Sequence, residues 1–160
     1  MEQPHNSATP RVRTLWSILG TQGITVGVVG WPLTYPAPAM RGYLVSDVYQ
    51  RLIQTPSGLD DRSAVYPPEI AIDVLRAIEG AETMPELQGS RLDRRHEAPG
   101  RTDRAYDGIA RTLAGTRPTE VTSVRYQSLD AIGHYFLRYA MQRDFGDVTE
   151  DERTRFGPVL

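Results

Sequence analysis

The chain contains no cysteine, no lysine and no long hydrophobic run. Without cysteine it has no disulfide bond, no thiolate metal ligand and no cysteine nucleophile. All 18 basic residues are arginine, which we attribute to codon bias in a GC-rich genome. No apolar stretch has the length of a membrane span, and residues 1–10 lack the basic and apolar regions of a signal peptide. We therefore expect a soluble, cytoplasmic chain.

The composition that is present is that of an ordinary globular protein. Hydrophobic residues make up 39% and charged residues 24% of 160 residues, enough for one domain with a buried core. A formal net charge of −2 gives no field that attracts nucleic acid or an anionic membrane, so we expect neither as a partner. We expect residues 1–10 to be a disordered tail and residues 11–160 to be the domain. Within it, residues 81–100 alternate charges of both signs around glycine and proline, which predicts a mobile insertion.

Short β-branched segments alternate with helical patterns along the chain, which predicts an α/β fold with a parallel or mixed sheet. Ile24–Val29 and Val121–Gln127 are both short, apolar and flanked by helical patterns. We expect them to be neighbouring or near-neighbouring strands of one sheet. Helices are expected over 13–22 with Thr14 as N-cap, over 67–80, over 101–116 with Thr102 or Asp103 as N-cap, from Asp130 onward, and after the capping-box motif that begins at Thr149.

Asp130 and His134 have the most specific chemical pattern in the chain. Asp130 follows a predicted strand and precedes an aromatic-rich helical pattern, so it lies where ligands bind in α/β sheets. Residues four apart on a helix point their side chains the same way. A carboxylate oxygen and an imidazole nitrogen so placed are suited to one divalent metal ion, and zinc accepts both. In the structural alternative, Asp130 caps the helix and His134 packs in the core.

A proline-rich loop follows the first predicted strand at residues 30–38. Its three prolines exclude regular structure and predict a rigid loop at the end of a buried strand. Trp31 and Tyr35 offer flat apolar surfaces to a ligand, and with Thr34 they are the candidate residues of a substrate pocket. In the alternative, the two aromatic rings only cover the core. After the next predicted strand, Asp47 is a conceivable metal ligand, although a helix-capping role is the stronger expectation.

These two regions resemble the alkaline phosphatase superfamily, and within it the type I phosphodiesterase/nucleotide pyrophosphatase branch. One part of the resemblance is an aromatic-led strand followed by a D-x-x-G-H element. The other is a G-W-P loop with T-x-P-A, followed by G-x-x-V-S-D. The matching residues are Tyr126, Asp130, Gly133, His134 and Phe136 for the first part, and Gly30, Trp31, Pro32, Thr34, Pro36, Ala37, Gly42, Val45, Ser46 and Asp47 for the second.

The resemblance implies metal-dependent hydrolysis of small phosphate esters by two metal ions, with Asp130 and His134 as ligands of one zinc ion. One metal in such a site activates a hydroxyl nucleophile and the other stabilises charge. In the family, an early aspartate and a threonine nucleophile precede the matched part, and a D-H-G element with a further histidine follows it. We find neither set and no nucleophile, so we expect a partial alkaline-phosphatase-like domain that is inactive alone. The alternative is a small α/β binding or interaction domain without catalysis.

Overall fold

The computed structural model describes Ser7 and residues 12–48, 62–79, 91–141 and 147–159. These residues form an α/β structure with a four-stranded mixed sheet and five α-helices, so the predicted α/β class with a parallel or mixed sheet is confirmed. The chain divides into two compact units. Residues 1–83 and 104–125 make up the sheet unit, and residues 84–103 and 126–160 make up the helical unit. Among the described residues, no helix is long and apolar enough to cross a membrane.

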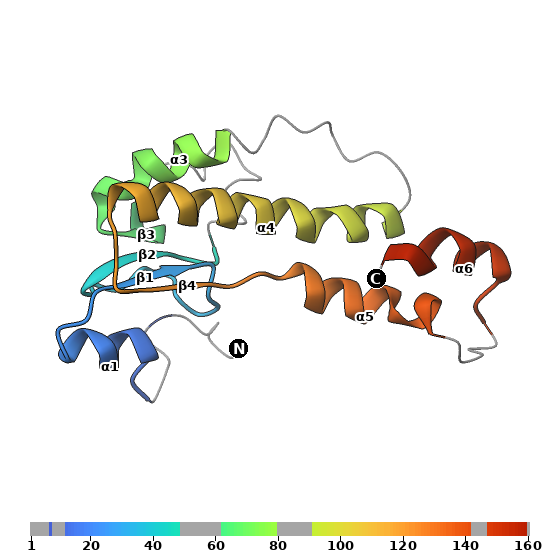
Figure 1. The fold of residues 1–160 in the computed structure, drawn as a ribbon, viewed down its shortest axis with the longest axis horizontal. Helices are drawn as coiled ribbons and strands as arrows, with labels where there is room; N and C mark the ends of the chain where they lie inside the picture. Colours follow the sequence, from blue (N-terminus) through green and yellow to red (C-terminus); the bar gives the residue numbers. More distant parts are fainter. Residues whose placement is uncertain (1–6, 8–11, 49–61, 80–90, 142–146, 160) are drawn as a thin grey trace, which may run out of the picture. The chain divides into compact units, whose positions relative to one another are not determined.

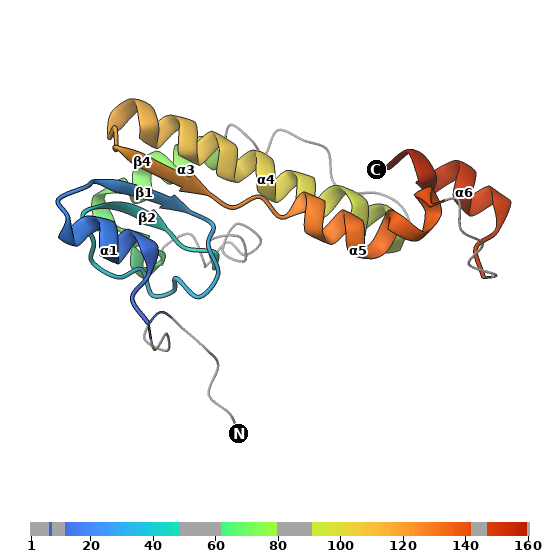
Figure 2. The same cartoon turned by 60° about the horizontal axis from the view of Figure 1, so that its bottom comes forward.

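The sheet has the strand order β3-β2-β1-β4, with β1 between two parallel neighbours (Figure 2). Strand β1 spans Val26–Val29, β2 spans Gly42–Val45 and β4 spans Val121–Val124. The two-residue strand β3, Val65–Tyr66, pairs with β2 in the antiparallel direction at one edge. The prediction that the first strand and the strand before Asp130 belong to one sheet is confirmed, because β1 and β4 pair directly.

Helices cover both faces of the sheet in the sheet unit (Figure 1). Helix α1, Leu15–Thr21, lies on one face, where Trp16 and Leu19 pack against buried residues of β1 and β2. Helix α3, Ala71–Glu79, and residues 104–116 of α4 lie on the other face. That second layer forms the larger core, which contains Val29, Tyr43, Val45, Ala64, Val65, Ile70, Val74, Ile78, Tyr106, Ile109, Ala110 and Leu113.

Local sequence signals set the ends of α1. The Thr14 side chain accepts a hydrogen bond from the Ser17 backbone N–H at 3.3 Å, so the predicted N-cap is confirmed. After the helix, Gly23 adopts a φ of +84°, a left-handed conformation that glycine enters without steric strain. Helix α1 therefore ends at Thr21, with Gln22 as its C-cap and a glycine directly after it.

Glu120 ties the entry of β4 to the entry of β1. Its Oε2 accepts hydrogen bonds from the Thr25 backbone N–H at 2.8 Å and the Thr25 hydroxyl at 3.0 Å. These two bonds to the charged carboxylate lower the pKa of Glu120. The ionised side chain thus binds the two parallel strands together at their starting ends.

We expect the fold to lose stability in acid as the Glu120 carboxylate becomes protonated. A carboxyl group whose pKa is lower in the folded chain stabilises the fold above its unfolded pKa of about 4.3, and this contribution disappears as the pH falls through the lower folded value. Glu120→Gln should therefore reduce the dependence of Tm on pH in that acidic window. Thermal unfolding by circular dichroism at stepped pH measures it, with Glu69→Gln at another exposed glutamate as the control. Equal pH dependence of the wild type and Glu120→Gln would contradict the prediction.

The helical unit contains α5, Ser128–Ala140, and α6, Glu150–Phe156, which pack side by side in both views (Figures 1 and 2). Phe136 of α5 is fully buried, with its ring centroid 5.7 Å from that of Phe156. The predicted capping box is confirmed: the Thr149 hydroxyl accepts from the Glu152 N–H, and the Glu152 carboxylate accepts from the Thr149 N–H.

Helix α4, Arg91–Thr116, begins ten residues earlier than the sequence predicts. A mobile insertion is expected over 81–100; residues 80–90 lie outside the described part, and residues 91–100 are helical. Pro99 and Gly100 favour a break there. Tertiary contacts of the next residues oppose that break: Thr102 is buried, and Asp103 binds the start of α5. The prediction that Thr102 or Asp103 caps α4 is wrong, because both lie inside it.

Candidate functional site

Asp130 and His134 lie on the exposed surface of α5. Asp130 is in the first turn of the helix and His134 follows one turn later, as the spacing predicts. The distance from Asp130 Oδ1 to His134 Nε2 is 3.4 Å. The side chains are 70% and 75% exposed, so both groups are accessible to a solvent-borne ion. Helix α5 therefore presents a carboxylate oxygen and an imidazole nitrogen together, outside the core.

The structural alternative for this pair is wrong in both of its parts. The N-cap of α5 is Gln127, so Asp130 lies inside the first turn and does not cap it. His134 does not pack in the core, because most of its side chain is exposed. The acceptor at the start of the helix is Asp103, which binds the backbone N–H groups of Gln127 and Ser128.

The spacing of the pair fits the edge of a tetrahedral zinc site. Ligand atoms about 2.1 Å from a tetrahedral zinc ion lie about 3.4 Å from one another. The separation of 3.4 Å between Asp130 Oδ1 and His134 Nε2 therefore needs little rearrangement for both to bind one ion. In the part of the chain that the structure describes, no third histidine, aspartate or glutamate joins them. A catalytic zinc takes three protein ligands, so Asp130 and His134 alone do not make up such a site.

The hydroxyl of Thr34 makes hydrogen bonds to its own loop and to the segment that follows β2. It donates to the Trp31 carbonyl at 2.5 Å and accepts from the Asp47 backbone N–H at 3.4 Å, and the residue is 2% exposed. Trp31 in turn donates its indole N–H to the Ser123 hydroxyl at 3.0 Å. These bonds join the segments that follow β1 and β2 to strand β4. Thr34 and Trp31 thus hold the carboxyl-terminal edge of the sheet in place.

Tyr35 and Asp47 also make contacts within this edge. The Tyr35 ring packs against the larger core, and its hydroxyl binds the Ser63 hydroxyl at 3.2 Å. Asp47 Oδ1 accepts a hydrogen bond from the Ser46 hydroxyl at 3.2 Å. The short helix that Asp47 is expected to cap extends to residue 52, and residues 49–61 lie outside the described part. The contacts of Tyr35 agree with the alternative, in which its ring covers the core.

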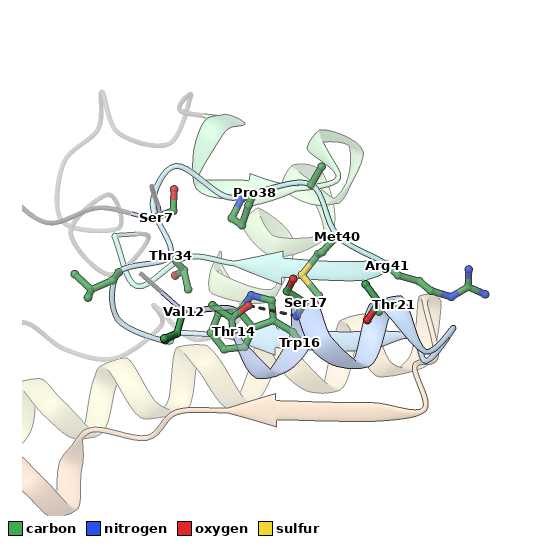
Figure 3. Close-up of a pocket in the computed structure, with 13 residues that line it drawn as sticks. Ser7, Val12, Thr14, Trp16, Ser17, Thr21, Thr34, Pro38, Met40 and Arg41 are labelled. Atoms are coloured by element: carbon green, nitrogen blue, oxygen red, sulfur yellow. Dashed lines mark hydrogen bonds between the residues drawn. The ribbon is translucent and has the colours of Figure 1, made fainter. Parts of the chain in front are cut away.

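A cavity of about 360 Å³ lies between α1 and residues 33–41 in the sheet unit. Figure 3 shows Trp16, Met40 and several hydroxyl side chains at its wall, with the Arg41 guanidinium directed away from it. Of the three predicted pocket residues, Thr34 lines this cavity. None of its described lining residues carries a carboxylate or an imidazole, so its wall lacks the groups that a zinc site needs.

Sequence reasoning missed the role of Asp103. It is separated from Gln127 and Ser128 by 24 and 25 residues, and its position within a helical pattern suggested a cap for its own helix. No local pattern reveals this role, because the sequence predicts that the helix begins at Asp130, and Gln127 is its N-cap only in the structure.

Comparisons with known proteins add no relative. No protein-family model matches the chain, and no curated protein or solved structure matches it. The fold and the site therefore define an α/β protein that carries an exposed Asp–His pair on a helix following a parallel strand.

Proposed function

We propose that this chain is part of a metal-dependent hydrolase of phosphate esters, of the phosphodiesterase or nucleotide pyrophosphatase type. The observation that carries the proposal is the Asp130–His134 pair, whose two ligand atoms lie 3.4 Å apart on an exposed helix. The D-x-x-G-H resemblance of the surrounding sequence supplies the reaction class. We also propose that the four-stranded sheet is part of an alkaline-phosphatase-like sheet. The parallel pairing of β1 with β2 and with β4 is compatible with this proposal.

In this proposal Asp130 binds a zinc ion through a carboxylate oxygen, and His134 binds it through Nε2. When bound, the metal stabilises negative charge on a phosphoryl or hydroxyl oxygen. The remaining ligands, the second metal and the nucleophile are not identified in this chain, so we propose that it is inactive alone.

Zinc affinity tests the pair directly. We expect the purified chain to bind Zn²⁺, and Asp130→Asn and His134→Ala each to weaken binding roughly tenfold or more, because even indirect partners of metal ligands contribute that much. Competition with a chromogenic chelator measures the affinity. Asp151→Asn is the matched control, since it removes the same charge from the first turn of α6. Both residues of the pair are exposed, so the Tm of the metal-free variants should stay close to that of the wild type.

Two outcomes contradict this function. If zinc affinity is the same in Asp130→Asn, His134→Ala and Asp151→Asn, the pair is only an exposed ion pair. If the first two variants unfold without metal and keep their zinc content per folded molecule, the pair is structural. In both cases the alternative of a binding or interaction domain without catalysis is favoured.

Hydrolysis of a nitrophenyl phosphodiester tests whether the site is incomplete. We expect the isolated chain to give no metal-dependent turnover above background, because no activated nucleophile is identified. Turnover that requires zinc and is lost in chelator would show that the chain holds a complete catalytic site.

A further inference from the structure

We infer that Asp103 is a positioning residue for the Asp130–His134 pair, an inference that rests on the function proposed above. Asp103 Oδ1 accepts the backbone N–H of Gln127 at 2.6 Å, and Oδ2 accepts the N–H of Ser128 at 2.9 Å. The Ser128 hydroxyl also donates to Oδ2. One carboxylate in α4 thus binds three donors at the start of α5.

These bonds replace a local cap that α5 lacks. The first backbone N–H groups of any helix have no partner within it. Gln127 occupies the N-cap position, and its side chain makes no capping hydrogen bond. The Asp103 carboxylate accepts two of these N–H groups and places negative charge at the positive end of the helix. The start of α5 is therefore held by a residue from another helix.

The first turn of α5 is also the turn that carries the candidate metal ligand. Asp130 lies in this turn, and its carboxylate faces His134 only while the turn is helical. Terminal turns without a cap fray, because few hydrogen bonds compensate for their ordering. In this arrangement Asp103 acts on the pair through the backbone of Gln127 and Ser128, by keeping the first turn of α5 formed.

Asp103→Ala tests the inference in the full chain. We expect zinc to bind about fivefold more weakly, because loss of a helix cap lowers the population of the helical first turn by about that factor. The amides of Gln127 and Ser128 should exchange faster with solvent, and the NMR chemical shift of the Asp130 Cα should move toward the unfolded value. Asp107→Asn is the control, because it changes an aspartate one turn later in α4 that pairs with Arg111.

A rescue variant separates positioning from general destabilisation. Serine is a preferred N-cap residue, so Gln127→Ser added to Asp103→Ala supplies a local acceptor once residue 127, which has a helical φ and ψ in the structure, takes the extended conformation of a capping residue. We expect this double variant to recover most of the zinc affinity and the helical shift of Asp130. Recovery of both would support positioning, whereas continued loss of affinity in a turn that is helical again would overturn it.

The readouts distinguish failure of this inference from failure of the proposed function. If Asp103→Ala leaves the Asp130 shift and zinc affinity unchanged, Asp103 does not position the pair. If Asp130→Asn and His134→Ala bind zinc as tightly as the wild type does, the proposed function fails. In that case the Asp130 shift alone decides whether Asp103 orders the turn, because that measurement needs no metal.

Discussion

Gly42→Ala is expected to destabilise the sheet unit by about 4 kcal/mol, through strained backbone and overpacking together. Gly42 begins β2 directly opposite Val26 of β1 and has a φ of +123°. A Cβ at this position would lie 2.1 Å from the Val26 carbonyl oxygen and 2.8 Å from its backbone nitrogen. Backbone atoms cannot move away by changing a rotamer, so β2 would have to separate from β1.

Gly23→Ala is the matched control for this prediction. Gly23 also has a positive φ, +84°, but in the described part of the chain no residue beyond its two neighbours has an atom within 4 Å of a Cβ built there. Alanine should therefore cost only the backbone strain, about 1 kcal/mol. Urea unfolding followed by circular dichroism gives both free energies of unfolding. If both variants lose the same free energy of unfolding, the close approach of Gly42 to β1 does not contribute to the effect of the alanine side chain.

Phe136→Ala is expected to destabilise the helical unit by about 3–5 kcal/mol. Phe136 is fully buried, and its ring lies 5.7 Å from Phe156 and 6.2 Å from Tyr139 between ring centroids. Helix α6 has seven residues, and a helix of that length is not stable in water without packing. Loss of the ring should therefore release α6 from α5. Faster amide exchange in α6 is the measurement that shows it.

The neighbouring substitution Leu137→Ala is the control. Leu137 occupies the next position of the same helix, but half of it is exposed, so its truncation should have a much smaller effect. Similar losses of stability from Phe136→Ala and Leu137→Ala would mean that the aromatic contact with α6 does not hold the helical unit together.

The candidate site was predictable to the extent that it depends on helical spacing. Asp130 and His134 are four residues apart, and any regular helix brings such side chains together. Their exposure was not predictable, because it depends on which face of α5 the buried Phe136 turns inward. The same limit applies to Thr34, whose hydroxyl is bound by Trp31 and Asp47 only once the loop has folded over the end of β2.

The sequence by itself determined those features whose interactions connect residues close together in the chain. The Thr14 cap and the Thr149–Glu152 capping box each connect residues three positions apart, and the β-branched segments of β1 and β4 predict strands from their composition. The tertiary structure alone decided that residues 91–100 are part of α4 and that Asp103 caps α5. The physical reason is distance along the chain: an acceptor 24 residues from its donor leaves no local pattern, and only folding brings the two together.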